Sequence, residues 1–493
     1  MRTLESGTTG SAARPAARSV PGAASPAAIL AIILISYFMI LLDNSVIFTG
    51  LPSIRAGLDL SPATLSWVQD AYTLVFGGLL LLGARAGDLV GRRRLFVIGL
   101  AIFGAASLLI GLAPTGWWVV AARALQGIGA AIVAPTSLAL LTAHFDGKAR
   151  ARAVAWYGAT AGIGASLGLV VGGALAAWVS WRAAFLVNVP IAVVMVVAAR
   201  KVLAGTERRR GRFDALGAVC ATLGMGALVF GIISSAEGGW TSPATVAGLV
   251  VGVVLLVTLV IHESRAAQPI MPLRLFGSRE RSGAYATRML YMGAMIGFFY
   301  FTTQYLQDAL GFSALQAGLG FLPMTAVNFA VAMLIPRLTT RFSGAVLLTA
   351  GVAATLAGMA WLSRLAPGDT YLVAIALPML LIGAGQGLAF APLTSAGIAR
   401  VPPEDAGAAS GLVNTAHQLG MALGLGILVT VSVHAGAGSL DGAAAATAHV
   451  GAALTGSSVL LVLALLVVAI VIVPAGRPAA KSVTDNLSEE TAA

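Results

Sequence analysis

Charged residues are scarce in this chain. Only 10% of its 493 residues are Asp, Glu, Lys or Arg, whereas 58% are hydrophobic. Soluble domains carry about 25% charged residues, so this chain has too little charge to cover a water-soluble surface. The composition excludes a soluble fold and predicts an integral membrane protein.

Further absences argue against a disulfide, a metal site, ATP hydrolysis and enzymatic activity. Cys220 is the only cysteine and lies in an apolar segment, so neither an intramolecular disulfide nor a cysteine metal site is expected. The five histidines are scattered, and no glycine-rich loop ends in Gly-Lys-Ser/Thr, so a metal site and direct ATP hydrolysis have no support. A membrane enzyme acting on lipid intermediates would need His, Asp or Glu clustered at one membrane face, and no such cluster occurs. We therefore expect no enzymatic activity, no metal and no cofactor.

The net charge of +11 does not indicate nucleic-acid binding, because the basic residues form short clusters between apolar segments. Fourteen segments reach the ~20 residues needed to cross a bilayer. They lie near 28–50, 65–85, 94–113, 117–141, 153–177, 183–203, 213–234, 243–262, 283–305, 315–336, 344–364, 370–398, 406–434 and 449–474. Connections after even-numbered segments hold most of the Arg and Lys, whereas odd-numbered ones hold little more than Arg55, Arg182 and Arg364. The positive-inside rule then places both termini in the cytoplasm.

A weak internal repeat divides the chain into two halves. ARAGDLVGRRR after the second segment has a degenerate counterpart, PRLTTRFSG, after the tenth, and Ala134-Pro135 corresponds to Ala391-Pro392. This offset predicts an all-α integral membrane protein with 14 transmembrane helices, built as two six-helix bundles in parallel repeat plus two inserted linker helices. The predicted parts are a disordered cytoplasmic tail, an N-terminal bundle, a linker with two helices, a C-terminal bundle and a second cytoplasmic tail, at 1–27, 28–203, 204–266, 267–476 and 477–493.

The segment from Trp117 to Leu141 contains one charge, Arg123. An arginine inside a bilayer costs about 2.5–3.5 kcal/mol on insertion scales, so a carboxylate partner is expected. Asp43 in the first segment and Asp70 in the second are the candidates. At a rise of ~1.5 Å per residue, Asp43 and Arg123 lie roughly 10 and 9 Å from the same membrane face. We therefore expect these two side chains to form an ion pair.

The connection from Gly83 to Arg94 resembles a motif of the major facilitator superfamily, in its fourteen-span drug:proton antiporter branch. Asp88, Gly91, Arg92 and Arg93 match the pattern, although Ala84 stands where its first glycine usually does. Glycine permits a tight turn, and the aspartate can pair with a neighbouring arginine or cap a helix N-terminus. A pairing that forms in one conformation and breaks in the other would make these four residues a cytoplasmic gate. The alternative is that the arginines only anchor the topology.

Two further stretches carry the same resemblance. RALQGIGAA matches through Arg123, Gln126, Gly127 and Gly129, and in the family this arginine is implicated in proton coupling. LDNSVIFTGLP matches the first-span signature through Asp43 and a closing proline, Pro52, but the residues between them depart from the usual sequence. The resemblance assigns proton coupling to Asp43 and Arg123. The alternative is a purely structural ion pair.

The fifth segment contains GIGASLGLVVGG. Gly164, Gly168, Gly172 and Gly173 fit the antiporter motif, and such glycines are expected to let one helix pack closely on another. Leu169 replaces the proline of that motif. This departure favours an alternative function, an exporter or proton symporter specific for one native metabolite.

Substrate contacts leave a weaker pattern. The aromatic run Phe298 to Phe301 in the ninth segment could line an apolar pocket for an aromatic cation, although such runs more often face lipid or the core. An ionisable side chain inside a membrane is a functional candidate, although Asp70 could be solvated and His417 could be a packing residue. The candidate substrate contacts are Asp70, Gln126, Phe298, Tyr300, Gln304 and His417.

The resemblance extends over nearly the whole chain through WRAAFLVNVPI, QPIMPLRLF and YLQDALGFSALQAGLGFLP. It implies a proton-coupled exporter of lipophilic drug-like or antibiotic compounds in the bacterial inner membrane, working as a monomer. The expected partners are the substrate, protons and membrane lipid, and not nucleic acid. A channel is disfavoured, because a buried arginine and a two-half repeat do not suit a permanently open pore.

Overall fold

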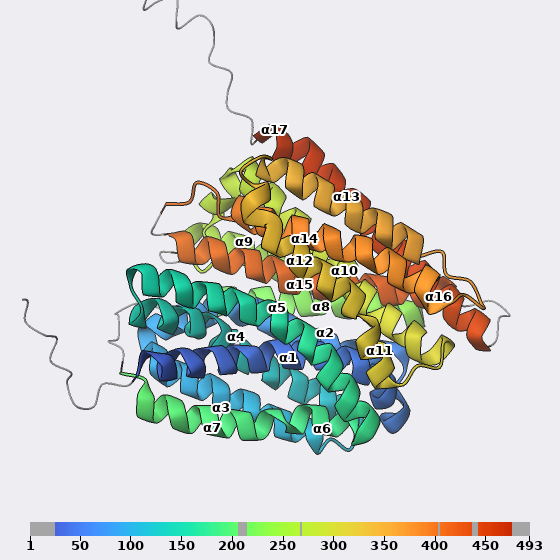
Figure 1. Cartoon of the computed structure of the whole chain (residues 1–493), viewed down its shortest axis with the longest axis horizontal. Coiled ribbons are helices and arrows are strands. Elements are labelled where there is room, and N and C mark those ends of the chain that lie inside the picture. The colour runs from blue at the N-terminus through green and yellow to red at the C-terminus, as the bar shows by residue number, and fades with distance from the viewer. Residues whose placement is uncertain (1–24, 206–213, 267–268, 403–404, 436–441, 476–493) are drawn as a thin grey trace, which may run out of the picture.

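The computed structural model is helical throughout the residues that it describes, which are 25–205, 214–266, 269–402, 405–435 and 442–475, and no strand occurs among them (Figure 1). Twelve helical segments of this part of the chain are long and apolar enough to cross a membrane. Apart from residues 25–27, both predicted tails lie outside the described residues.

The first half of the molecule is formed by seven helices, of which α6 and α7 follow each other within one candidate span, Trp181–Val202. Ser25, Ser61 and Thr115 begin three of these helices by accepting a backbone N–H on the side-chain oxygen. The helices are α1 (Pro26–Leu58), α2 (Pro62–Val90), α3 (Arg92–Gly111), α4 (Gly116–His144), α5 (Gly147–Trp178), α6 (Trp181–Leu186) and α7 (Asn188–Val202).

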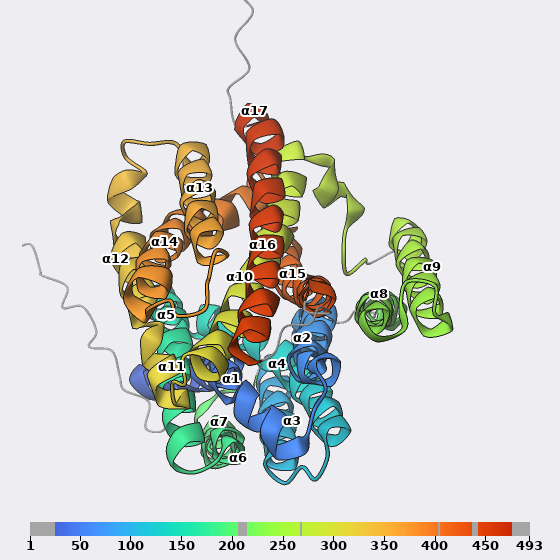
Figure 2. The same cartoon turned by 90° about the vertical axis from the view of Figure 1, so that its right-hand side faces the viewer.

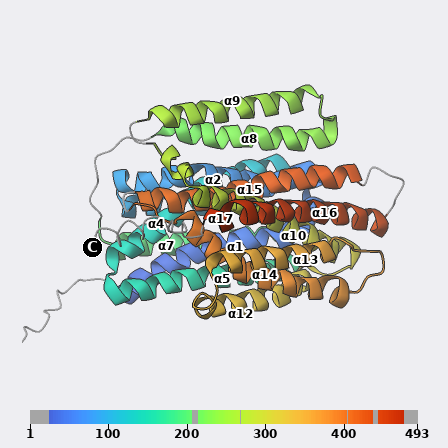
Figure 3. The same cartoon turned by 90° about the horizontal axis from the view of Figure 1, so that it is seen from above.

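Two helices, α8 (Ala215–Gly238) and α9 (Pro243–Arg265), follow and pack against each other. They lie beside the two halves, along one edge of the molecule (Figures 2 and 3). Only α8 reaches both halves closely, through α2 and α15 (Ala406–Ala435). Asp214 begins α8 by accepting the N–H of Gly217, and it also bonds His262 of α9 at 2.7 Å. The pair therefore holds together through its own contacts.

The second half contains the remaining helices, several of which are interrupted by short irregular turns. The turns are a 3₁₀ turn, η1 (Leu273–Gly277), and three π-helical turns, η2 (Tyr305–Ala309), η3 (Leu372–Ala376) and η5 (Val468–Ile472). With α15, the helices are α10 (Arg279–Gln304), α11 (Ala314–Gly320), α12 (Leu322–Leu338), α13 (Gly344–Leu362), α14 (Leu377–Gly397), α16 (Gly442–Val467) and α17 (Val473–Ala475).

The two halves face each other, as Figure 2 shows, and meet along two helix pairs, α2 with α15 and α5 with α11. At the membrane face that holds the end of α1, here called the Arg55 side, Arg55 forms an ion pair with Asp308 of η2 at 2.9 Å. Gln307 adds a hydrogen bond of 3.1 Å to the carbonyl of Thr49. At the opposite face, here called the Arg92 side, α4 packs mainly on α1, α2, α3 and α5 of its own half. The ion pair between the halves lies on the Arg55 side, and the hydroxyl of Thr415 on α15 adds a bond of 3.2 Å to the carbonyl of Gly77, midway along α2.

Each of the fourteen predicted segments overlaps a helix or consecutive helices, but the count of fourteen transmembrane helices stays a prediction, because twelve candidate spans are found among the described residues. Pro52 does not close the first segment: α1 continues past it to Leu58 and ends at Asp59, whose φ of 49° is left-handed. A proline removes one backbone hydrogen bond, a loss that helices in a membrane tolerate. The helices α5 and α10 are not among the twelve candidate spans, and the 26 residues of α10 include four charged ones.

Candidate functional site

The expected ion pair between Asp43 and Arg123 is present. Oδ2 of the carboxylate lies 2.7 Å from Nη1 of the guanidinium, and neither side chain is exposed. The pair joins α1 to α4 inside the first half. Burying two charges costs several kcal/mol each, which only close pairing and further hydrogen bonds offset.

Uncharged side chains supply those further bonds. The second carboxylate oxygen of Asp43, Oδ1, accepts a hydrogen bond of 2.8 Å from Gln126 and one of 2.8 Å from Asn188 on α7. The same Gln126 amide nitrogen reaches Ser107 of α3 at 2.9 Å, and its oxygen accepts from Arg123 at 2.6 Å. One carboxylate therefore links α1, α4 and α7, and Gln126 extends the network to α3.

The helix α2 completes the surroundings of Arg123. The Nε of the guanidinium donates to the carbonyl of Val68 at 3.0 Å, and the ring of Tyr72 lies 4.2 Å from its central carbon. Two polar atoms of the cluster, Nη2 of Arg123 and Oδ1 of Asn188, have no hydrogen-bond partner in the described part of the chain. The cluster thus contains one buried donor group and one buried acceptor atom that form no hydrogen bond within the described residues.

Asp70, the other carboxylate of the sequence prediction, lies on α2 and does not reach Arg123. Its side chain is completely buried, so it is not solvated as one alternative supposed. Neither of its oxygens has a hydrogen-bond donor among the residues that the structure describes. Asp70 is therefore a second buried carboxylate with none of the support that Asp43 has.

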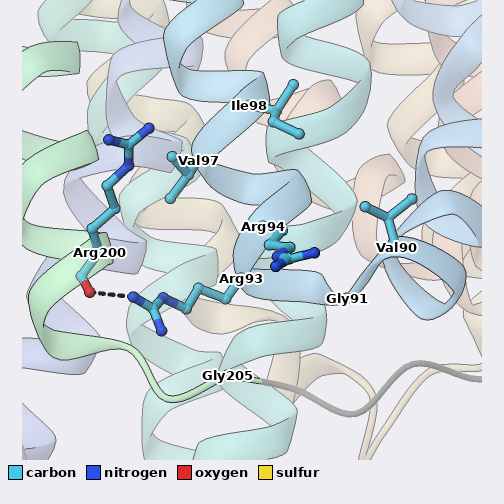
Figure 4. A pocket seen from close by; sticks show the side chains of 8 residues that line it. All are labelled: Val90, Gly91, Arg93, Arg94, Val97, Ile98, Arg200 and Gly205. Carbon is cyan, nitrogen blue, oxygen red and sulfur yellow. Dashed lines mark hydrogen bonds between the residues drawn. The ribbon is translucent and has the colours of Figure 1, made fainter.

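The predicted cytoplasmic gate lies where α2 passes into α3. Gly91 has a φ of 99°, which a residue with a side chain rarely adopts, so the turn requires glycine. Arg92 donates to the carbonyl of Ala139 on α4 at 3.0 Å. Arg93 donates to the carbonyl of Arg200 at the end of α7, on the wall of a cavity of about 700 Å³ (Figure 4). The side chain of Asp88 lies outside the described residues, so its pairing stays a prediction.

Only part of the predicted substrate contacts lie together in this conformation, namely Asp70, Tyr300 and Gln304. Phe298 is fully buried against Phe321, with ring centroids 5.6 Å apart, and Tyr300 packs on Phe301. Gln304 bonds the backbone carbonyl of Tyr300 at 3.3 Å. Two residues of this run reach the first half: Phe299 stacks on Phe48 at 5.5 Å, and Tyr300 lies near enough to Asp70 of α2 to interact with its charge.

The other predicted contacts lie elsewhere. Gln126 belongs to the Asp43 cluster in the first half, and His417 lies on α15 in the second half, with its ring 6.1 Å from that of Phe390. The roles of these residues in substrate binding stay predictions.

The glycines of α5 lie where the sequence places them, against a neighbouring helix. A Cβ atom on Gly168 would stand 2.6 Å from the Cβ of Ser45, and one on Gly172 would stand 2.7 Å from the Cα of Val46, both on α1. Gly164 likewise faces Leu41 of α1, whereas Gly173 faces α11 of the second half. Because glycine has no side chain, the backbones of these helices can approach each other closely.

Comparison with known proteins decides the family. A model of the Major Facilitator Superfamily matches residues 33–425. The cephamycin export protein of Amycolatopsis lactamdurans is 41% identical over 432 residues, which cover 86% of this chain and 88% of that protein. The chain belongs to the Major Facilitator Superfamily. Because the superfamily consists of transporters, this finding also confirms that the protein is not an enzyme.

Further relatives and structures agree with the superfamily. The puromycin resistance protein of Streptomyces alboniger is 39% identical over 417 residues, covering 83% of this chain and 82% of that protein. A crystal structure of a peptide transporter in complex with sulfate has a TM-score of 0.66 at 16% identity and covers 90% of this chain and 94% of its own. The nucleoside transporter NupG has a TM-score of 0.63 at 13% identity, over 90% and 99% of the two chains. At these identities the structures show the superfamily fold alone.

Sequence reasoning missed several residues of this superfamily member. Asn188 and Ser107 gave no signal, because single amides and hydroxyls are ordinary inside membrane helices. Arg288 did give one, since it is a charge inside the predicted segment 283–305, but it was assigned no role from the sequence. Arg288 is 3% exposed and lies 3.9 Å from the ring centre of Phe390.

Proposed function

We propose that the chain is a proton-coupled antiporter that exports lipophilic drug-like or antibiotic compounds across the bacterial inner membrane in exchange for protons. Relatives named for cephamycin export and for puromycin resistance support this function. The observation that carries it is the buried cluster around Asp43, in which one carboxylate holds α1, α4 and α7 together.

The mechanism follows from the charge of Asp43. As a carboxylate it accepts charge-assisted hydrogen bonds, which are about twice as strong as neutral ones. A proton arriving on Asp43 removes that charge, so the bonds from this carboxylate to Arg123, Gln126 and Asn188 all weaken. The three helices are then free to shift, and the substrate is released as the halves rock. Return of the proton to the cytoplasm restores the cluster.

The architecture of the proposal is the one expected from the sequence. Fourteen spans form two six-helix bundles, at 28–203 and 267–476, with two added helices within 204–266. Both termini lie in the cytoplasm, and the chain works as a monomer. Asp88, Gly91, Arg92 and Arg93 then lie on the cytoplasmic face and act as the gate. The basic Arg92 side supports this orientation.

Asp43→Asn tests the function. Asn keeps the shape of the side chain but cannot carry the proton, so the proton flux that substrate drives across the membrane of proteoliposomes is expected to fall at least about tenfold, equivalent to 1.4 kcal/mol. Asp59→Asn is the matched control, because Asp59 is exposed and asparagine also accepts its left-handed backbone. Equal flux and equal drug accumulation in cells expressing wild type and Asp43→Asn would refute the antiporter.

A second candidate function rests on Leu169, which stands where the antiporter motif has proline. It is a symporter, or an exporter specific for one native metabolite. The direction of flux separates a symporter from the antiporter, because a symporter moves protons and substrate the same way. When substrate is added outside the vesicles, an antiporter drives protons out of them, whereas a symporter carries protons in. Proton efflux would therefore favour the antiporter.

A further inference from the structure

Arg288 is a buried cation of the second half that the proposed mechanism does not use. It lies nine residues into α10, which is ~13 Å along the helix axis. Its Nη1 is 3.4 Å from the hydroxyl of Thr394 on α14, a long contact, and its Nε has no partner in the described part of the chain. The guanidinium otherwise faces the ring of Phe390. These groups do not neutralise a charge.

No carboxylate of the second half is at hand to do so. The structure describes four acidic residues between 269 and 475, and each has another partner. They are Glu280 with Arg400, Asp308 with Arg55, Asp405 with Arg274, and Asp369, which accepts the backbone N–H of Ala366. All four lie at helix ends or in loops, whereas Arg288 lies inside a helix.

Arg123 shows what the same side chain looks like when the protein neutralises it. That guanidinium has a carboxylate at 2.7 Å, an amide oxygen at 2.6 Å and a backbone carbonyl at 3.0 Å. Arg288 has one long hydroxyl contact and an aromatic ring. A buried guanidinium is expensive to maintain unless an anion joins it, so the missing partner points to a ligand.

We propose that Arg288 binds the carboxylate of the exported compound, so that the protein selects organic anions. A guanidinium matches a carboxylate with two parallel hydrogen bonds. Thr394 on α14 lies beside Arg288, where its hydroxyl accepts from the guanidinium and donates to the backbone carbonyl of Phe390 at 2.8 Å. The ring of His417 on α15 lies 6.1 Å from that of Phe390. The helices α10, α14 and α15 that provide these residues contact one another (Figure 2).

The ring of Phe390 makes the site reachable. It covers the guanidinium at 3.9 Å and is itself 37% exposed. In the proposed site, a shift of this ring gives the ligand access to Arg288. After that movement the ring can lie against the apolar body of the compound while the guanidinium holds its carboxylate. This inference names the substrate class of the proposed exporter and therefore rests on that function.

The experiment compares an acid with its ester. Purified full-length protein in detergent is titrated with cefoxitin, a cephamycin with one carboxylate, and with cefoxitin methyl ester, which has none. Wild type should bind the acid more tightly than the ester. Arg288→Gln should weaken binding of the acid about tenfold or more and leave the ester unchanged, since a hydrogen bond to a charged group is lost. Arg288→Lys should keep part of the preference, because it keeps the charge.

Matched controls separate a loss of the carboxylate contact from a general loss of binding or folding. Arg364→Gln removes an exposed loop arginine and should change neither affinity. Unchanged ester binding by Arg288→Gln shows that the variant is folded. A wild type without preference for the acid, or an equal loss for acid and ester in Arg288→Gln, would overturn the proposal. Failure of the Asp43→Asn flux test would instead refute the proposed function, because acid binding does not depend on transport.

Discussion

At the scale of single residues, Arg123 and Asp43 neutralise each other's charge. Each is completely buried, and each would be left as an isolated charge if the other were removed. Removing one member of a buried pair is strongly destabilising, whereas replacing both by uncharged side chains is often neutral. The cluster therefore predicts a strong coupling between the two positions.

Arg123→Met should lower the free energy of unfolding by about 3–5 kcal/mol, because the carboxylate of Asp43 is left buried without its cation. Asp43→Asn combined with Arg123→Met should recover most of that loss, since no charge remains. Unfolding midpoints of the purified variants in one detergent measure the difference. A double variant as unstable as Arg123→Met would contradict the coupling.

The residue scale also marks the limit of what the sequence reveals. Asp43 and Arg123 were predictable as partners because charges are rare in apolar segments and theirs lay at one depth. Asn188, Ser107 and Tyr72 were not, since a polar or aromatic side chain can face any direction from its helix. Arg288 shows a third case, a visible charge whose surroundings came from α14 and α15, helices roughly a hundred residues further along the chain.

At the scale of helices, the helical segments could be predicted from the sequence, but which helices pack against each other could not. A helix in a bilayer must satisfy its own backbone, so an apolar run of sufficient length becomes a helix wherever it occurs. The observed helix ends differ from the predicted ones, as at Leu58, because the helix continues beyond the apolar run. The glycine pattern of α5 predicted close packing, but only the structure shows that Gly168 and Gly172 meet α1 while Gly173 meets α11.

Gly172→Ala should destabilise the protein by about 1–3 kcal/mol, the usual cost of overpacking, because the new Cβ would lie 2.7 Å from the backbone of Val46. Gly158→Ala is the control on the same helix. Nothing lies within 4 Å of a Cβ there, so alanine should stabilise α5 by up to about 1 kcal/mol through its helix propensity. Opposite changes in the unfolding midpoints would support the packing; a loss at both positions would show that α5 tolerates no substitution.

At the scale of the whole molecule, one ion pair joins the two halves on the Arg55 side. Arg55 and Asp308 come from different halves, and their side chains are 39% and 29% exposed. An ion pair this exposed contributes about 0.2–1 kcal/mol. Such a contribution is small for stability, but it is enough to bias two conformations that differ by a few kcal/mol. No sequence pattern predicted this pair, because its two residues stand 253 positions apart, one in each half.

Breaking that pair should open the Arg55 side. A cysteine replacing Phe48, which is 4% exposed, in a Cys220→Ser background should react with maleimide between about 1.4 and five times faster once Arg55→Asp is added, as the 0.2–1 kcal/mol implies. Swapping both charges, Arg55→Asp with Asp308→Arg, should restore slow labelling because the attraction returns. A cysteine replacing Trp117, which is 63% exposed, should label at one rate in all backgrounds. Unchanged labelling at position 48, or a swap that fails to restore it, would mean that the pair does not hold the halves together.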